Sequence, residues 1–127
     1  MYCDLHGHSR KKNIFMYGNN FQDNPVATRV FPYILSKLCG HFSFEDCRFS
    51  SCASKESTAR VAMWRELNIP NVFTMETSFC GADIGPLHDK HFQLDHLTQT
   101  GHSLLKALLV YCKIETTESE LKLTDVV

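Results

Sequence analysis

The stretch NVFTMETSFCG, residues 71–81, decides the fold, because β-branched and aromatic residues dominate it and Gly81 closes it. We predict a strand here. Alternation divides its side chains between two sides: Val72, Thr74, Glu76 and Ser78 on one, and Phe73, Met75, Thr77 and Phe79 on the other. A carboxylate among such neighbours costs free energy if it is buried without a partner. Glu76 is therefore either a buried general base or an exposed glutamate on an edge strand.

The segments around this strand alternate between strand and helix patterns. Strands are predicted over residues 1–8 and 42–52, and a buried strand or a tight loop over residues 13–18. Helices are predicted over residues 28–38, 54–67 and 94–113, where apolar residues recur at helical spacing. Residues 18–27 and 81–91 have the Gly, Pro, Asn and Asp content that is typical of loops.

This order of elements predicts an α/β fold. About three strands and three helices amount to half of a sheet, so we expect one incomplete domain over residues 1–113. Half a sheet exposes an open edge and apolar surface to water. Residues 114–127 are predicted to form an acidic, flexible tail.

The composition argues against several classes of protein. A net charge of -1 leaves no dominant basic face for a nucleic acid. No apolar run approaches the ~20 residues of a membrane helix, and no signal peptide precedes the first acidic residue. The six cysteines form no C-x-x-C pair and are expected to be free, mostly buried thiols, with a contact between Cys47 and Cys52 as the alternative. We therefore expect a soluble, cytosolic protein that binds neither membranes nor nucleic acid.

A second polar cluster lies in DLHGHS, residues 4–9. On a strand, Asp4, His6 and His8 share one face. Two imidazoles on one face offer nitrogens to a single metal ion, and Asp4 is placed to hold a ring N–H. The alternative is a polar strand face without a metal.

Arg60 lies in the first turns of the helix predicted over residues 54–67. An arginine beside the free amides of a helix N-terminus makes an anion site. The alternative is a solvated arginine that pairs with Glu56, four residues earlier, which stabilises a helix by only ~0.3–0.5 kcal/mol.

Three stretches together resemble one family: YCDLHGHSRKKNIFMYG, SKESTARVAMWRELNI and FTMETSFCG. In their order and spacing they are similar to the cytosolic carboxypeptidases, the tubulin-deglutamylating branch of the zinc metallocarboxypeptidases. The resemblance runs from residue 1 to about residue 112. It implies the C-terminal half of a mixed sheet that is flanked by helices.

The resemblance also implies roles for single residues. His6 is expected to be the third zinc ligand, Asp4 its orienting neighbour, and His8 a residue that lines the substrate cleft. Glu76 is expected to be the catalytic base, which deprotonates the attacking water and passes the proton to the leaving amine. Arg60 is expected at the floor of the specificity pocket, where it accepts a glutamate side chain.

The implied activity is zinc-dependent removal of C-terminal glutamate from acidic tails such as polyglutamylated tubulin, in the cytosol and at microtubules or cilia. In the family an H-x-x-E motif supplies the first two zinc ligands, and this sequence contains no H-x-x-E. We therefore expect one Zn²⁺ per complete domain, one ligand in this chain, the N-terminal half of the domain as a missing partner, and no activity in isolation. The alternative is a non-catalytic acidic-peptide binder or a degenerate fragment without bound zinc.

Overall fold

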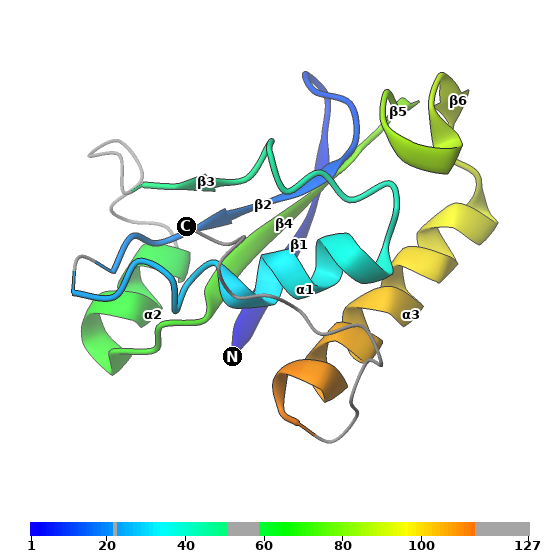
Figure 1. Ribbon diagram of the computed structural model, residues 1–127. Coiled ribbons are helices and arrows are strands. Elements are labelled where there is room, and N and C mark those ends of the chain that lie inside the picture. The colour runs from blue at the N-terminus through cyan, green and yellow to red at the C-terminus, as the bar shows by residue number, and fades with distance from the viewer. Residues whose placement is uncertain (22, 51–58, 114–127) are drawn as a thin grey trace.

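The computed structural model describes residues 1–21, 23–50 and 59–113. Its main sheet has the strand order β1-β4-β2-β3 (Figure 1). The strands are β1 (Tyr2–His8), β4 (Val72–Ser78), β2 (Ile14–Gly18) and β3 (Arg48–Phe49). β1 is parallel to β4, β4 is antiparallel to β2, and β2 is parallel to β3. The predicted α/β class with a mixed sheet is confirmed.

Strand β4 lies inside the sheet, between β1 and β2. The predicted strand over residues 71–81 is therefore confirmed, and the buried-strand alternative for residues 13–18 is the correct one. Within the described residues β1 pairs with β4 alone, so its other edge is open. The sheet has the open edge expected of a partial domain.

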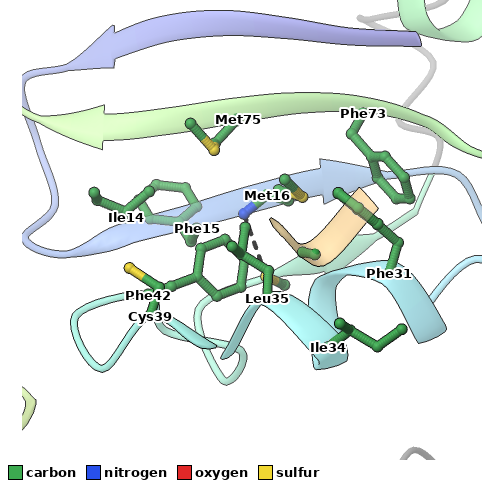
Figure 2. Packing of buried hydrophobic residues seen from close by; sticks show 12 residues of the cluster. Ile14, Phe15, Met16, Phe31, Ile34, Leu35, Cys39, Phe42, Phe73 and Met75 are labelled. Atoms are coloured by element: carbon green, nitrogen blue, oxygen red, sulfur yellow. Dashed lines mark hydrogen bonds between the residues drawn. The ribbon is translucent and has the colours of Figure 1, made fainter. Parts of the chain in front are cut away.

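Two helices cover one face of the sheet, α1 (Val30–Leu38) and α3 (Leu94–Tyr111), and they pack against each other (Figure 1). Phe31 of α1 stacks on Phe73 of β4 with ring centroids 5.7 Å apart, and both side chains are buried (Figure 2). The core cluster also includes these residues: Ile14, Met16, Ile34, Leu35, Met75 and Ala107. Apolar residues at strand and helix spacing meet here, and their removal from water stabilises the fold.

Helix α2 (Ala59–Leu67) contacts β4 and carries the fully buried Val61. The start of the helix predicted over residues 54–67 lies outside the described residues. Helices over 28–38 and 94–113 are confirmed with ends shifted by about two residues. The tail predicted over residues 114–127 also lies outside the described part of the chain.

The strand predicted over residues 42–52 is wrong in extent, because within the described part of that range, residues 42–50, the only strand is β3, Arg48–Phe49. Phe42 and Cys47 are buried, but turns lie between them, so burial here comes from irregular backbone rather than from a strand. The loop predicted over residues 81–91 contains short elements: β5 (Gly81–Ala82), a 3-10 turn η2 (Gly85–Leu87) and β6 (Lys90–His91). Pattern-based prediction misses pieces of two or three residues.

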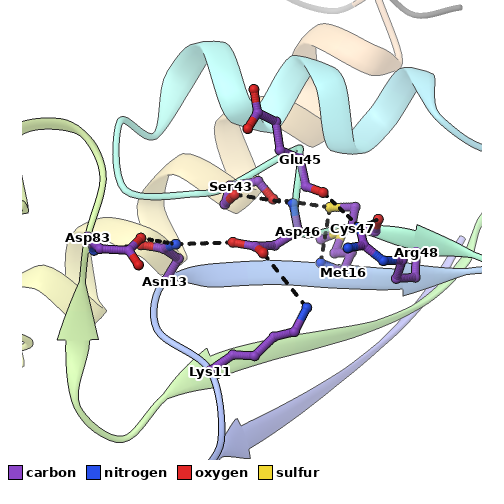
Figure 3. Close-up of polar contacts among 9 residues, drawn as sticks. All are labelled: Lys11, Asn13, Met16, Ser43, Glu45, Asp46, Cys47, Arg48 and Asp83. Carbon is purple, nitrogen blue, oxygen red and sulfur yellow. Dashed lines mark hydrogen bonds and ion pairs between the residues drawn. The ribbon is translucent and has the colours of Figure 1, made fainter.

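Asn13 fastens the loop between β1 and β2 to two other segments (Figure 3). Its backbone has a φ of 70°, and its Nδ2 donates to Asp46 Oδ2 at 3.1 Å and to Asp83 Oδ1 at 2.6 Å. Burial raises the pKa of Asp46, but hydrogen bonds from Asn13 and Ser43 and the charge of Lys11 hold it below its usual value. This junction fixes the turn that returns the chain from β1 into β2.

Apolar side chains are exposed beside the open edge. Leu5 is 61% exposed and Phe79 is 76% exposed. They line a groove of about 470 Å³ between the strand ends and α3, together with Leu97 and Leu104. The expected exposure of apolar surface is present. None of the described helices is long and apolar enough to cross a membrane.

The described cysteines are all free thiols. Cys39 and Cys47 are buried, and burial raises the pKa of Cys47 to about 12. Cys80 and Cys112 are exposed, so the expectation of mostly buried thiols is only partly correct. Cys52 lies outside the described residues, and so does its alternative contact with Cys47.

Candidate functional site

The candidate site lies on the face of the sheet turned away from α1 and α3, where several titratable side chains of β1, β2 and β4 lie together. His6 of β1 is paired with Glu76 of β4, which is paired in turn with Phe15 of β2. Partners in register on neighbouring strands point to the same face of a sheet, so these three side chains form a row across three strands. We call this face, with Asp4, His6, His8, Tyr17 and Glu76, the polar face.

Glu76 is buried, with 9% of its surface exposed. Its Oε2 lies 3.7 Å from His8 Nδ1, and the His8 ring meets Phe15 edge-on with centroids 5.2 Å apart. The alternative of an exposed glutamate on an edge strand is wrong, because β4 is an inner strand. The carboxylate is thus shielded and close to one imidazole, an arrangement that suits proton transfer.

His6 and His8 share the polar face but contact different carboxylates. His6 Nε2 lies 2.8 Å from Asp4 Oδ2, and both side chains are about half exposed. When Nε2–H of His6 donates a hydrogen bond to Asp4, the free lone pair of the imidazole is on Nδ1. This is the contact that an orienting role for Asp4 requires.

Arg60 is buried at the end of β2, with 4% of its surface exposed. Its Nη1 donates to Gly18 O at 2.9 Å and to Asn19 Oδ1 at 2.6 Å. Both acceptors are neutral, and burial lowers the pKa of the guanidinium. The alternative partner, Glu56, lies outside the described residues.

Tyr17 on the polar face is close enough to both Glu76 and Arg60 to feel their charges. Its ring meets Phe15 edge-on with centroids 5.6 Å apart. Burial and the charge of Glu76 raise the pKa of Tyr17, while Arg48 and Arg60 lower it. Phe15, paired with Glu76, and Gly18, bonded to Arg60, are three residues apart, or roughly 10 Å of strand.

The sequence interpretation missed two residues of this region. Tyr17 was placed in an apolar run and Asn19 in a loop. Asn19 is fully buried and bonds Arg60, which is 41 residues away. Nothing in the local pattern marks Asn19, because an Asn in a Gly- and Asp-rich stretch is typical of a turn.

The polar face does not complete a metal centre by itself. Among the described residues, no group of three His, Cys, Asp or Glu side chains is arranged to hold a metal ion. A catalytic zinc normally has three protein ligands. His6, oriented by Asp4, fits the part of one such ligand.

Comparison with known proteins gives consistent matches along nearly the whole chain. It is 46% identical over 123 residues to cytosolic carboxypeptidase 3 from Bos taurus, covering 93% of this chain and 12% of that protein. It is 43% identical over 121 residues to cytosolic carboxypeptidase 2 from Mus musculus, covering 93% of this chain and 14% of that protein. The chain thus spans only about an eighth of the length of these relatives. No family model matches it.

The fold has a counterpart among solved structures. A metallo-carboxypeptidase from Burkholderia cenocepacia superimposes with a TM-score of 0.71 at 16% identity. The match covers 90% of this chain and 30% of that chain. The mixed sheet described above therefore has the fold of part of that larger metallo-carboxypeptidase chain.

Proposed function

We propose that this chain, over the length that it spans, belongs to the cytosolic carboxypeptidase family and forms part of a zinc metallocarboxypeptidase domain that removes C-terminal glutamate from acidic protein tails. The single observation that supports this most strongly is the row on the polar face. There the buried Glu76 lies on the strand beside His6, with both side chains on one face. A shielded base next to an imidazole that can ligate a metal is a combination that suits metal-assisted hydrolysis of a peptide bond.

We assign His6 as one zinc ligand, through the nitrogen that does not face Asp4. The described residues supply no complete ligand set, so the other ligands would come from the rest of a domain. When bound, zinc supplies a Lewis acid for the scissile carbonyl. We expect the isolated chain to be inactive for this reason.

Glu76 would accept a proton from the attacking water and return it to the leaving amine. His8, whose Nδ1 lies 3.7 Å from Glu76 Oε2, would line the cleft and limit the positions of that carboxylate. Burial of Glu76 keeps bulk water from competing for the proton.

Arg60 would accept the acidic side chain of the substrate. A guanidinium that is 4% exposed and bonded to neutral oxygens keeps a charge that a carboxylate can stabilise. Acidic tails such as that of polyglutamylated tubulin are the proposed substrates, and the cytosol, including microtubules and cilia, is the proposed location.

The Arg60 guanidinium also supports a second candidate function, binding of acidic peptides without catalysis. Arg60 needs no metal to bind a carboxylate, and the described residues complete no metal site. This candidate predicts binding of glutamate-ended peptides with no release of glutamate.

The test is a segment-exchange enzyme, in which this chain replaces the matched segment of cytosolic carboxypeptidase 2 from Mus musculus. We expect zinc-dependent release of glutamate from glutamate-ended peptides. Glu76→Gln should lower the turnover by roughly 10²–10⁴-fold, because a general base contributes about that much. Glu66→Gln, an exposed position on α2, is the matched control. Full turnover in Glu76→Gln would remove Glu76 from the role of base.

A further inference from the structure

The side chain of Asn19 holds Arg60 at both ends. Its Oδ1 accepts a hydrogen bond from Arg60 Nη1 at 2.6 Å, and its Nδ2 donates to the backbone carbonyl of Arg60 at 3.3 Å. One carboxamide thus fixes both the guanidinium and the backbone from which it extends. Among the described residues, the only other acceptor of the guanidinium is Gly18 O, at 2.9 Å from Nη1.

The clamp is shielded from water. Asn19 is 0% exposed and Arg60 is 4% exposed. Water does not replace these hydrogen bonds when one is lost, so removal of the carboxamide leaves buried polar groups without partners. Asn19 follows directly on β2, so the clamp connects the end of the sheet to the start of α2.

The clamp is also neutral. An aspartate has the same shape, but its charge would compensate the guanidinium. With an asparagine, the cation is held in place and still lacks a carboxylate among the described residues. Both described acceptors of the guanidinium, Gly18 O and Asn19 Oδ1, are bonded by Nη1, so the edge formed by Nε and Nη2 is the one that suits a bidentate carboxylate.

We propose that Asn19 is a specificity-determining residue: its carboxamide positions the Arg60 guanidinium and leaves the positive charge for an acidic side chain of the substrate. This inference rests on the proposed role of Arg60. It adds that residue 19 sets the preference for acidic substrates, because its side chain is neutral and can both accept and donate a hydrogen bond.

The decisive variant is Asn19→Asp in the segment-exchange enzyme, with peptides that end in Glu or in Gln as substrates. We expect the preference for Glu over Gln, as a ratio of kcat/KM, to fall at least tenfold, mainly through KM for the Glu peptide. Asn20→Asp adds the same charge at the exposed neighbouring residue and should leave the ratio within about twofold of the parent. A structural role alone predicts that Asn19→Asp keeps the preference wherever it folds, and that result overturns the proposal.

Three further variants keep the outcome interpretable. Asn19→Ala removes the clamp without adding charge, so it should raise KM for the Glu peptide and leave kcat near the parent value; an unchanged KM contradicts the proposal. Glu56→Gln should leave the preference unchanged, and a preference that increases would contradict the proposal that the charge of Arg60 is left for the substrate. Arg60→Ala distinguishes failure of the role of Arg60 from failure of the role of Asn19. If Arg60→Ala keeps the preference for Glu, the proposed role of Arg60 is wrong. If Arg60→Ala loses the preference while the Asn19 variants keep it, only the proposed role of Asn19 is wrong.

Discussion

The two sides of strand β4 are in opposite environments, although their residues alternate along one chain segment. Phe73 and Met75 point into the apolar core under α1 and α3. Glu76 points to the polar face, beside His6 and His8. The core side contributes stability and the polar side is suited to chemistry. Substitutions on the two sides should therefore separate stability from activity.

The largest expected loss of stability comes from the core side. Phe73 is fully buried and stacks on Phe31, so Phe73→Ala should lower the free energy of unfolding by about 3–5 kcal/mol, because it removes buried surface and leaves a cavity. Denaturant unfolding of the isolated chain measures this. Phe79→Ala, at a side chain that is 76% exposed, is the matched control and should change the free energy by less than about 1 kcal/mol. Equal losses would mean that the core is not where the structure places it.

A smaller effect is expected on the polar face, where Asp4 contacts His6 at 2.8 Å. Asp4→Asn should weaken zinc binding to the segment-exchange enzyme by roughly 10–100-fold, because the partner that orients the ligand loses its charge. The melting temperature of the isolated chain should barely change, since both side chains are exposed.

The control for this change is a second exposed His–Asp pair. His88 Nδ1 lies 2.9 Å from Asp89 Oδ2, away from the polar face. Asp89→Asn should leave zinc affinity unchanged, as measured by competition with a chelator. Equal loss from both variants would show that Asp4 has no specific part in holding the metal.

The smallest expected effect is a pH dependence on the core side. His41 is buried, with Nε2 at 2.8 Å from Thr100 Oγ1. Burial and the charge of the neighbouring His96 lower the pKa of His41 below 6.5, although a hydrogen bond to the His96 backbone acts in the opposite direction. The folded state therefore binds the proton less readily than the unfolded chain. Stability from this group is fully present above about pH 6.5 and is lost as the pH falls toward the lower folded pKa.

Unfolding of the isolated chain between about pH 8 and 5 tests this sign. His41→Gln should flatten the fall in stability below pH 6.5, whereas His88→Gln, at an exposed residue, should keep the slope of the parent. A parent-like slope in His41→Gln would show that other groups cause the acid sensitivity.

Much of the sheet follows from local pattern. The alternation in VFTMETS fixes which side of β4 is apolar, and it places Glu76 with Thr74 on the other side. The burial of β4 did not follow from that pattern, because the identity of its neighbours depends on β1 and β2 pairing with it from distant parts of the chain. That long-range pairing decided between a buried and an exposed glutamate.

The positions of the candidate site residues could be predicted from the sequence better than the contacts that hold them. DLHGHS places Asp4 and His6 on one face by strand geometry, and the structure joins them. Arg60 is expected to act with a helix N-terminus, but the start of that helix lies outside the described residues; its described hydrogen bonds are donated to Gly18 and Asn19 at the end of β2. A contact across 41 residues leaves no trace in local spacing.

The most direct test compares Glu76→Gln and Phe73→Ala in the segment-exchange enzyme, at a temperature where both variants are folded. The measurement is the rate of glutamate release per folded enzyme from a glutamate-ended peptide. The account predicts that Glu76→Gln loses at least about 100-fold in rate with an unchanged melting temperature, while Phe73→Ala melts lower but keeps its rate. A Glu76→Gln enzyme that releases glutamate at the parent rate would contradict the account.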